Sequence, residues 1–150
     1  DYTVRTRITE GLGLAESAKS AIQTDGSASA ADLTRTATTW NAQAAGTGAN
    51  SKYVNSVQMD GGTGLITIVY NDTQVGLAAA ERTITLTPWV RSGAAGAGES
   101  LAAAIAAGRT GTIDWGCASE TNATATASGI TVVAVGAAGV RAKYAPAACR

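Results

Sequence analysis

Two cysteines are the residues whose chemistry says most about this chain. Cys117 and Cys149 lie in the last quarter of the 150 residues, and such a pair could be two free thiols, part of a metal site or one disulfide. There is no histidine and no Cys-x-x-Cys motif, so a zinc site would need carboxylates to complete it. We therefore favour a disulfide, which places the chain in an oxidising compartment. It would stabilise the fold by roughly 3–4 kcal/mol.

The rest of the sequence offers little to a catalytic site. Without histidine, neither a Ser-His-Asp triad nor a Cys-His pair can form, and the acidic residues are spread singly along the chain. The stretch GAAGAGES, residues 93–100, has the glycine spacing of a phosphate-binding loop, but Glu99 stands where that loop carries a lysine. We expect a plain loop there, with Glu99 near the start of a short helix. We predict no enzyme activity, no cofactor and no metal ion.

The charges indicate no strong long-range field. Eleven basic and eleven acidic residues cancel, which gives no general attraction to nucleic acid or to an anionic membrane. Arg141, Lys143 and Arg150 cluster near the second cysteine and could engage an anionic ligand, although such groups are more often simply solvated. No apolar run reaches 18 residues.

The first 22 residues have the spacing of an amphipathic helix. One face carries an apolar stripe at intervals of three and four residues, made of Val4, Ile8, Leu12, Ala15, Ala18 and Ile22. We predict that Gly26 ends the helix with a left-handed cap. Asp1 could serve as an N-cap but has no capping box behind it, so we expect this start to be a cut or processing point.

The remaining pattern predicts an antiparallel sheet. Residues 27–50 are expected to be mostly loop, with Trp40 as their one aromatic residue. Alternation then predicts a hairpin over 51–72 with its turn at 61–64, a strand over 82–90 that ends or meets an edge at Pro88, and a strand over 111–119 after a short helix at 99–108. One further strand is predicted over 130–135. The fold class is therefore α+β, a long helix packed on a four-stranded antiparallel sheet in one domain.

This order of parts resembles the type IV pilins, and in detail the type IVa major pilin of a Pseudomonas-like bacterium. DYTVRTRITEGLGLAESAKSAI resembles the second half of their long first helix, and GTIDWGCAS and AKYAPAACR resemble the segments that carry the two disulfide cysteines. The resemblance implies a pilin fold divided into the helix (1–25), an αβ-loop (26–51), the sheet (52–118) and a disulfide-bounded region (117–149). It also implies an apolar first half of the helix, absent from this chain, that anchors the subunit in the inner membrane before assembly.

The same resemblance implies a function in an extracellular filament. The subunit would polymerise with further copies of itself through the first helix, with the pilus assembly machinery as a partner, and would serve adhesion and twitching motility. Host-cell glycans or abiotic surfaces are the implied targets, and DNA uptake and phage reception are roles that the resemblance leaves open. The receptor-contacting turns fall on Arg141, Lys143, Tyr144, Ala145 and Pro146. The bounded region is longer here and rich in Ala and Thr, so no glycan specificity carries over.

Two alternatives remain open from the sequence. A minor pilin or a secretion-system pseudopilin would share the fold, although pseudopilins often carry a calcium loop in place of the disulfide. A secreted carbohydrate-binding module would explain a disulfide without catalytic residues, but not the leading amphipathic helix.

Overall fold

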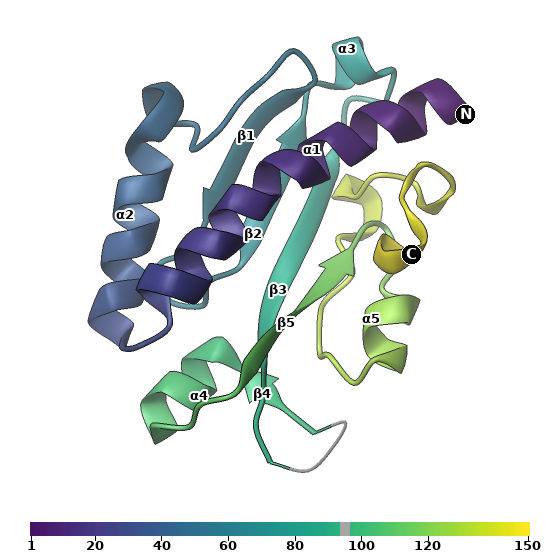
Figure 1. Cartoon of the computed structure of the whole chain (residues 1–150). Helices are drawn as coiled ribbons and strands as arrows, with labels where there is room; N and C mark the ends of the chain where they lie inside the picture. The colour runs from purple at the N-terminus through teal and green to yellow at the C-terminus, as the bar shows by residue number, and fades with distance from the viewer. Residues whose placement is uncertain (94–96) are drawn as a thin grey trace.

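One long helix lies across one face of an antiparallel sheet in the computed structural model, which describes residues 1–93 and 97–150 (Figure 1). The strands run in the order β1-β2-β3, β5 pairs with the far side of β3, and the two-residue β4 pairs with the end of β3. The predicted α+β class is confirmed, with β4 added to the four expected strands. The elements are α1 (Tyr2–Ala21), η1 (Ile22–Gly26), α2 (Ala30–Gly46), β1 (Val54–Met59), β2 (Ile66–Tyr70), α3 (Asp72–Val75), β3 (Thr83–Arg91), β4 (Glu99–Ser100), α4 (Leu101–Ala107), β5 (Thr112–Ala118), α5 (Ala123–Ala127), η2 (Gly136–Ala138), η3 (Ala142–Tyr144) and η4 (Ala147–Cys149).

Helix α1 packs on the sheet through the predicted stripe. Its first turn is capped by the Asp1 carboxylate, which accepts a hydrogen bond from the Val4 N–H at 3.0 Å. The predicted left-handed cap at Gly26 is wrong, because the helix continues as the π-helical turn η1 and Gly26 has no positive φ. A side chain at Gly26 would meet Thr36 of α2 at 3.2 Å, so the glycine serves close packing rather than a cap. The stripe residues buried in the core are Val4, Ile8, Ala15, Ala18 and Ile22.

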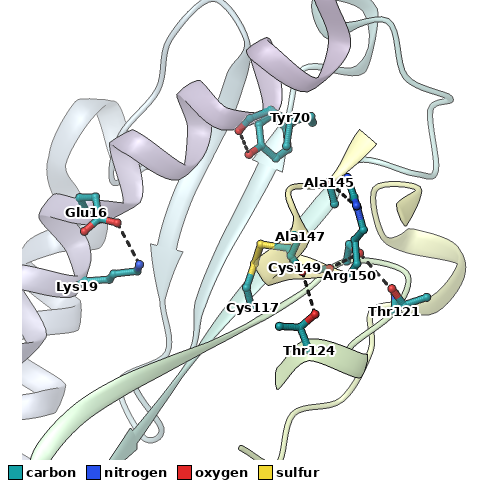
Figure 2. Close-up of a disulfide and its surroundings, with 12 residues drawn as sticks. Glu16, Lys19, Tyr70, Cys117, Thr121, Thr124, Ala145, Ala147, Cys149 and Arg150 are labelled. Carbon is teal, nitrogen blue, oxygen red and sulfur yellow. Dashed lines mark hydrogen bonds and ion pairs between the residues drawn. A yellow bond between two sulfur atoms is a disulfide. The ribbon is translucent and has the colours of Figure 1, made fainter. Parts of the chain in front are cut away.

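A buried tyrosine fixes the position of α1 on the sheet. Tyr70 of β2 is fully buried, and its hydroxyl donates to the Ile8 carbonyl of α1 at 2.6 Å (Figure 2). The ring occupies the space of the missing side chain at Gly11, where a Cβ would lie 2.4 Å from the ring. Burial, with a smaller contribution from Glu10, raises the pKa of the Tyr70 hydroxyl far above its usual range. The hydroxyl therefore stays protonated and can donate.

The prediction of a mostly irregular connection over 27–50 is wrong. Helix α2 occupies much of it, with the Ser29 hydroxyl capping its first turn. Leu33, Ala37 and Trp40 are buried at spacings of four and three. The many threonines favour helix only weakly, and three apolar residues are too few to reveal the period. Burial against the sheet, rather than local preference, stabilises this helix.

Helix α2 also covers the open edge of the sheet. The side-chain amide of Asn41 donates to the Met59 carbonyl at 2.8 Å and accepts from the Met59 N–H at 2.9 Å, as a neighbouring strand would do. Two residues earlier, the Val57 carbonyl accepts from the Trp40 indole N–H at 2.8 Å. The outward-facing backbone groups of β1 at these positions are therefore satisfied.

Strand β3 covers almost the predicted residues and runs through Pro88 to Arg91. Of the two predictions for Pro88, the end of the strand is wrong, whereas a position at a locally open edge agrees with the pairing. Strand β2 pairs with β3 as far as Leu86, and β4 pairs with it from Trp89 onward. Pro88 lies between these two partners on that side of β3, where a residue without an N–H can be accommodated.

Candidate functional site

The predicted disulfide joins the last strand to the end of the chain. Cys117 of β5 and Cys149 of η4 are bonded with their Cα atoms 4.5 Å apart, and both are buried (Figure 2). The buried Ser119 hydroxyl donates to the Cys149 carbonyl, and the Thr124 hydroxyl of α5 donates to the Ala147 carbonyl at 2.9 Å. The tail is thus held to β5 and to α5 by side chains as well as by the covalent bond.

Residues 123–132 cover the outer face of β5. Ile130 and Val132 pack with Ala118 and Ala125 in a second, smaller apolar cluster. Gly116 permits this contact, since a Cβ there would lie 2.7 Å from Ile130. The strand predicted over 130–135 is wrong, because this segment has no strand partner among the described residues and the Ile130 N–H donates to the Ala125 carbonyl. Ile130 and Val132 are buried while Thr131 and Val133 are exposed, so these residues alternate as in a strand although they form a loop.

Arg141 is the most strongly paired of the predicted receptor residues. Its guanidinium lies 3.2 Å from the carboxylate of Glu120 and 3.7 Å from that of Glu81. Glu120 also accepts from the Ala142 N–H, and this bond, followed by Arg141, lowers the pKa of Glu120. Arg141 therefore contributes little net positive charge to the surface.

The other four residues form a tight turn. Lys143 is exposed, and its ammonium lies 5.0 Å from the ring centre of the half-buried Tyr144. Ala145 is fully buried in the main core and Pro146 is half-buried. Within this predicted set, the side chains of Lys143 and Tyr144 are thus better placed to meet a ligand than that of Ala145.

Two arginines outside the predicted receptor set hold this turn. The Nε of Arg5, on α1, donates to the Lys143 carbonyl at 2.8 Å. The Nε of Arg150 donates to the carbonyls of Ala142 at 3.1 Å and Ala145 at 2.9 Å. Arg150 belongs to the basic cluster predicted from the sequence, whereas nothing in the sequence connects Arg5 with residue 143.

The part of the chain that the structure describes shows no grouping of three metal-ligating side chains. The predicted loop over 93–100 lies partly outside the described residues. Glu99 is in β4, directly before α4, and forms an ion pair with Arg109 at 2.7 Å. Across residues 1–93 and 97–150, no helix has both the length and the apolarity that a bilayer span requires.

Comparison with known proteins gives matches over nearly the whole chain. A profile of the pilin family, described as Pilin (bacterial filament), matches residues 4–150. The chain is similar to the crystal structure of a Pseudomonas aeruginosa (strain Pa110594) type IV pilin, with 56% sequence identity and a TM-score of 0.91 over 99% of this chain and 98% of that one. No curated protein sequence matches it. Family profile, helix-on-sheet architecture and C-terminal disulfide agree, and the chain belongs to the type IV pilin family.

Proposed function

We propose that this chain is a type IVa major pilin, the principal subunit of surface filaments used for adhesion and twitching motility. The observation that supports this most is the match to a type IV pilin over nearly the full length of both chains. Members of the family are structural filament subunits, which agrees with the absence of histidine and of a catalytic motif in the sequence.

Helix α1 offers the surface for self-association. One of its faces is buried on the sheet, while the opposite face remains open over the length of the helix. Tyr2 is 82% exposed there, which is unusual for a large aromatic side chain. Packing between such helices in neighbouring subunits would bury this face. Residues 26–51 and 117–149 would lie at further contacts or on the outer surface of the filament.

Deletion of the gene in its native bacterium tests the filament role. We expect the deletion strain to lack surface filaments by electron microscopy and to lose twitching on agar, and the wild-type gene to restore both. Antibody against this chain should label the filaments along their length, and the chain should dominate sheared surface material. Labelling of rare points would indicate a minor pilin, and unchanged filaments after deletion would contradict the proposal.

The adhesive role is assigned to the turn within the disulfide-bounded region. Host-cell glycans or abiotic surfaces would meet the exposed Lys143 and the edge of Tyr144. Bacteria that carry Lys143→Ala should keep their filaments but attach severalfold less well to glycan-coated surfaces. Lys52→Ala removes an exposed lysine outside the turn and serves as the control. The same strains can be assayed for DNA uptake and for phage infection, the two roles that the resemblance leaves open.

A further inference from the structure

Three cations surround the turn formed by η3 and the two residues after it. Arg5 comes from α1, Lys143 from the turn itself and Arg150 from the chain end, and all three side chains are exposed. Within the described residues none of them forms an ion pair, whereas Arg141 beside them is paired with two carboxylates. The sequence predicted a basic cluster that contains Arg141. Among the described residues, the unpaired cations around the turn include Arg5 instead, because Arg141 is neutralised by its two carboxylate partners.

The two guanidinium groups are held in the same way. Each donates through its Nε to main-chain carbonyls of the turn, Arg5 to that of Lys143 and Arg150 to those of Ala142 and Ala145. Figure 2 shows Arg150 beside Ala145. These bonds leave the two terminal nitrogens of each guanidinium without a partner among the described residues. A guanidinium fixed at one nitrogen loses less entropy when its terminal pair binds a planar or tetrahedral anion.

We infer that Arg5, Lys143 and Arg150 form a clamp for the carboxylate or sulfate group of an acidic saccharide. This inference rests on the proposed adhesive role of the turn and names the ligand class for it. The cations surround one short turn rather than line a groove, and no series of aromatic rings alternates with them, which favours a compact anionic group over a nucleic-acid strand. Tyr144, half-buried beside Lys143, adds an apolar surface for the sugar ring.

Binding of the full chain to immobilised polysaccharides tests the clamp. Heparin presents sulfate, polygalacturonate presents carboxylate, and dextran is the neutral control. We expect both acidic polymers to bind with an affinity that falls as salt rises, and dextran not to bind. Arg5→Gln and Arg150→Gln should each weaken binding about tenfold. Arg35→Gln removes the same charge from an exposed site on α2 and should leave the affinity unchanged.

Several results would overturn the clamp. These are failure of both acidic polymers to bind, equal losses in Arg35→Gln and Arg5→Gln, or displacement of the polysaccharides by duplex DNA at lower concentration than by free heparin. Arg5→Lys, which keeps the charge and loses the paired nitrogens, should bind less well than wild type and better than Arg5→Gln. Circular dichroism melting confirms that each variant is folded. The filament proposal is tested separately, because filaments on cells do not depend on polysaccharide binding.

Discussion

Replacing Tyr70 by Phe tests how α1 is held on the sheet. The change removes the buried hydrogen bond from the Tyr70 hydroxyl to the Ile8 carbonyl and keeps the ring in the space above Gly11. A buried hydrogen bond of this kind contributes about 1–1.5 kcal/mol. In a domain of this size that loss lowers the melting temperature by about 2–6 °C near neutral pH.

The stability difference between wild type and Tyr70→Phe should also depend on pH. Burial raises the pKa of Tyr70 in the folded state, whereas in the unfolded chain a tyrosine titrates near pH 10. Its contribution is therefore complete below pH 10 and is lost as pH rises, because only the unfolded state releases the proton. At pH 11 the wild type has lost about 1.4 kcal/mol through this residue, and Tyr70→Phe has lost none of it. We expect the two proteins to have nearly equal stability near pH 11.

Urea denaturation at a series of pH values measures this difference directly. The other three tyrosines and the lysines are the same in both proteins, so their contributions to the difference in stability cancel. Tyr2→Phe, at a side chain that is 82% exposed, should follow the wild type at every pH. A constant gap between wild type and Tyr70→Phe from pH 7 to 11 would refute the reasoning, since it would mean that Tyr70 ionises equally in both states.

Three further predictions concern stability. Gly11→Ala should destabilise the protein by about 1–3 kcal/mol, because the new Cβ would overlap the buried ring of Tyr70. Gly13→Ala should stabilise it by about 0.5–1 kcal/mol, because a Cβ there meets open space and alanine favours helix. Thermal melting distinguishes the two variants. Joint replacement of Cys117 and Cys149 by Ser should cost about 3.7 kcal/mol for a separation of 32 residues, measured by chemical denaturation. The pKa of Glu120 is lowered in the folded state, so its carboxylate contributes stability that is present above pH 4.5 and is lost as the pH falls. In Glu120→Gln the free energy of unfolding, measured by urea denaturation, should therefore fall less steeply below pH 4.5 than in the wild type. An unchanged dependence on pH would contradict this.

Local patterns made most of the fold predictable from the sequence. The stripe of α1 and the alternation in β2 and β3 are repeated signals, each supported by several residues. Helix α2 was not predicted because its three buried residues are too few to show a period, and its packing against β1 is not visible in the local pattern. Residues 130–135 show the opposite case, in which a strand was predicted and a loop is found. The apolar side chains that indicated a strand are those with which this loop packs on β5.

The candidate site was predictable only in part. The cysteines could be paired because the chain holds just two, and chain position placed Lys143 near the second of them. The contact between Arg5 and Lys143 joins residues 138 positions apart and depends on how α1 crosses the sheet. The pairing of Arg141 with Glu81 likewise required the path of the chain around β3. Charge counts along the sequence therefore could not identify which cations remain unpaired.

The way Asn41 completes the hydrogen bonding of Met59 bears on how such a subunit polymerises. An open strand edge would let subunits join sheet to sheet, in variable register and without a defined end, as in cross-β aggregates. With that edge terminated by a side chain of the same molecule, this route to growth is blocked on the β1 side. In the proposed filament, α1 rather than a strand edge would then set the geometry of assembly, because Asn41 and Trp40 of α2 occupy the edge along which subunits could otherwise stack.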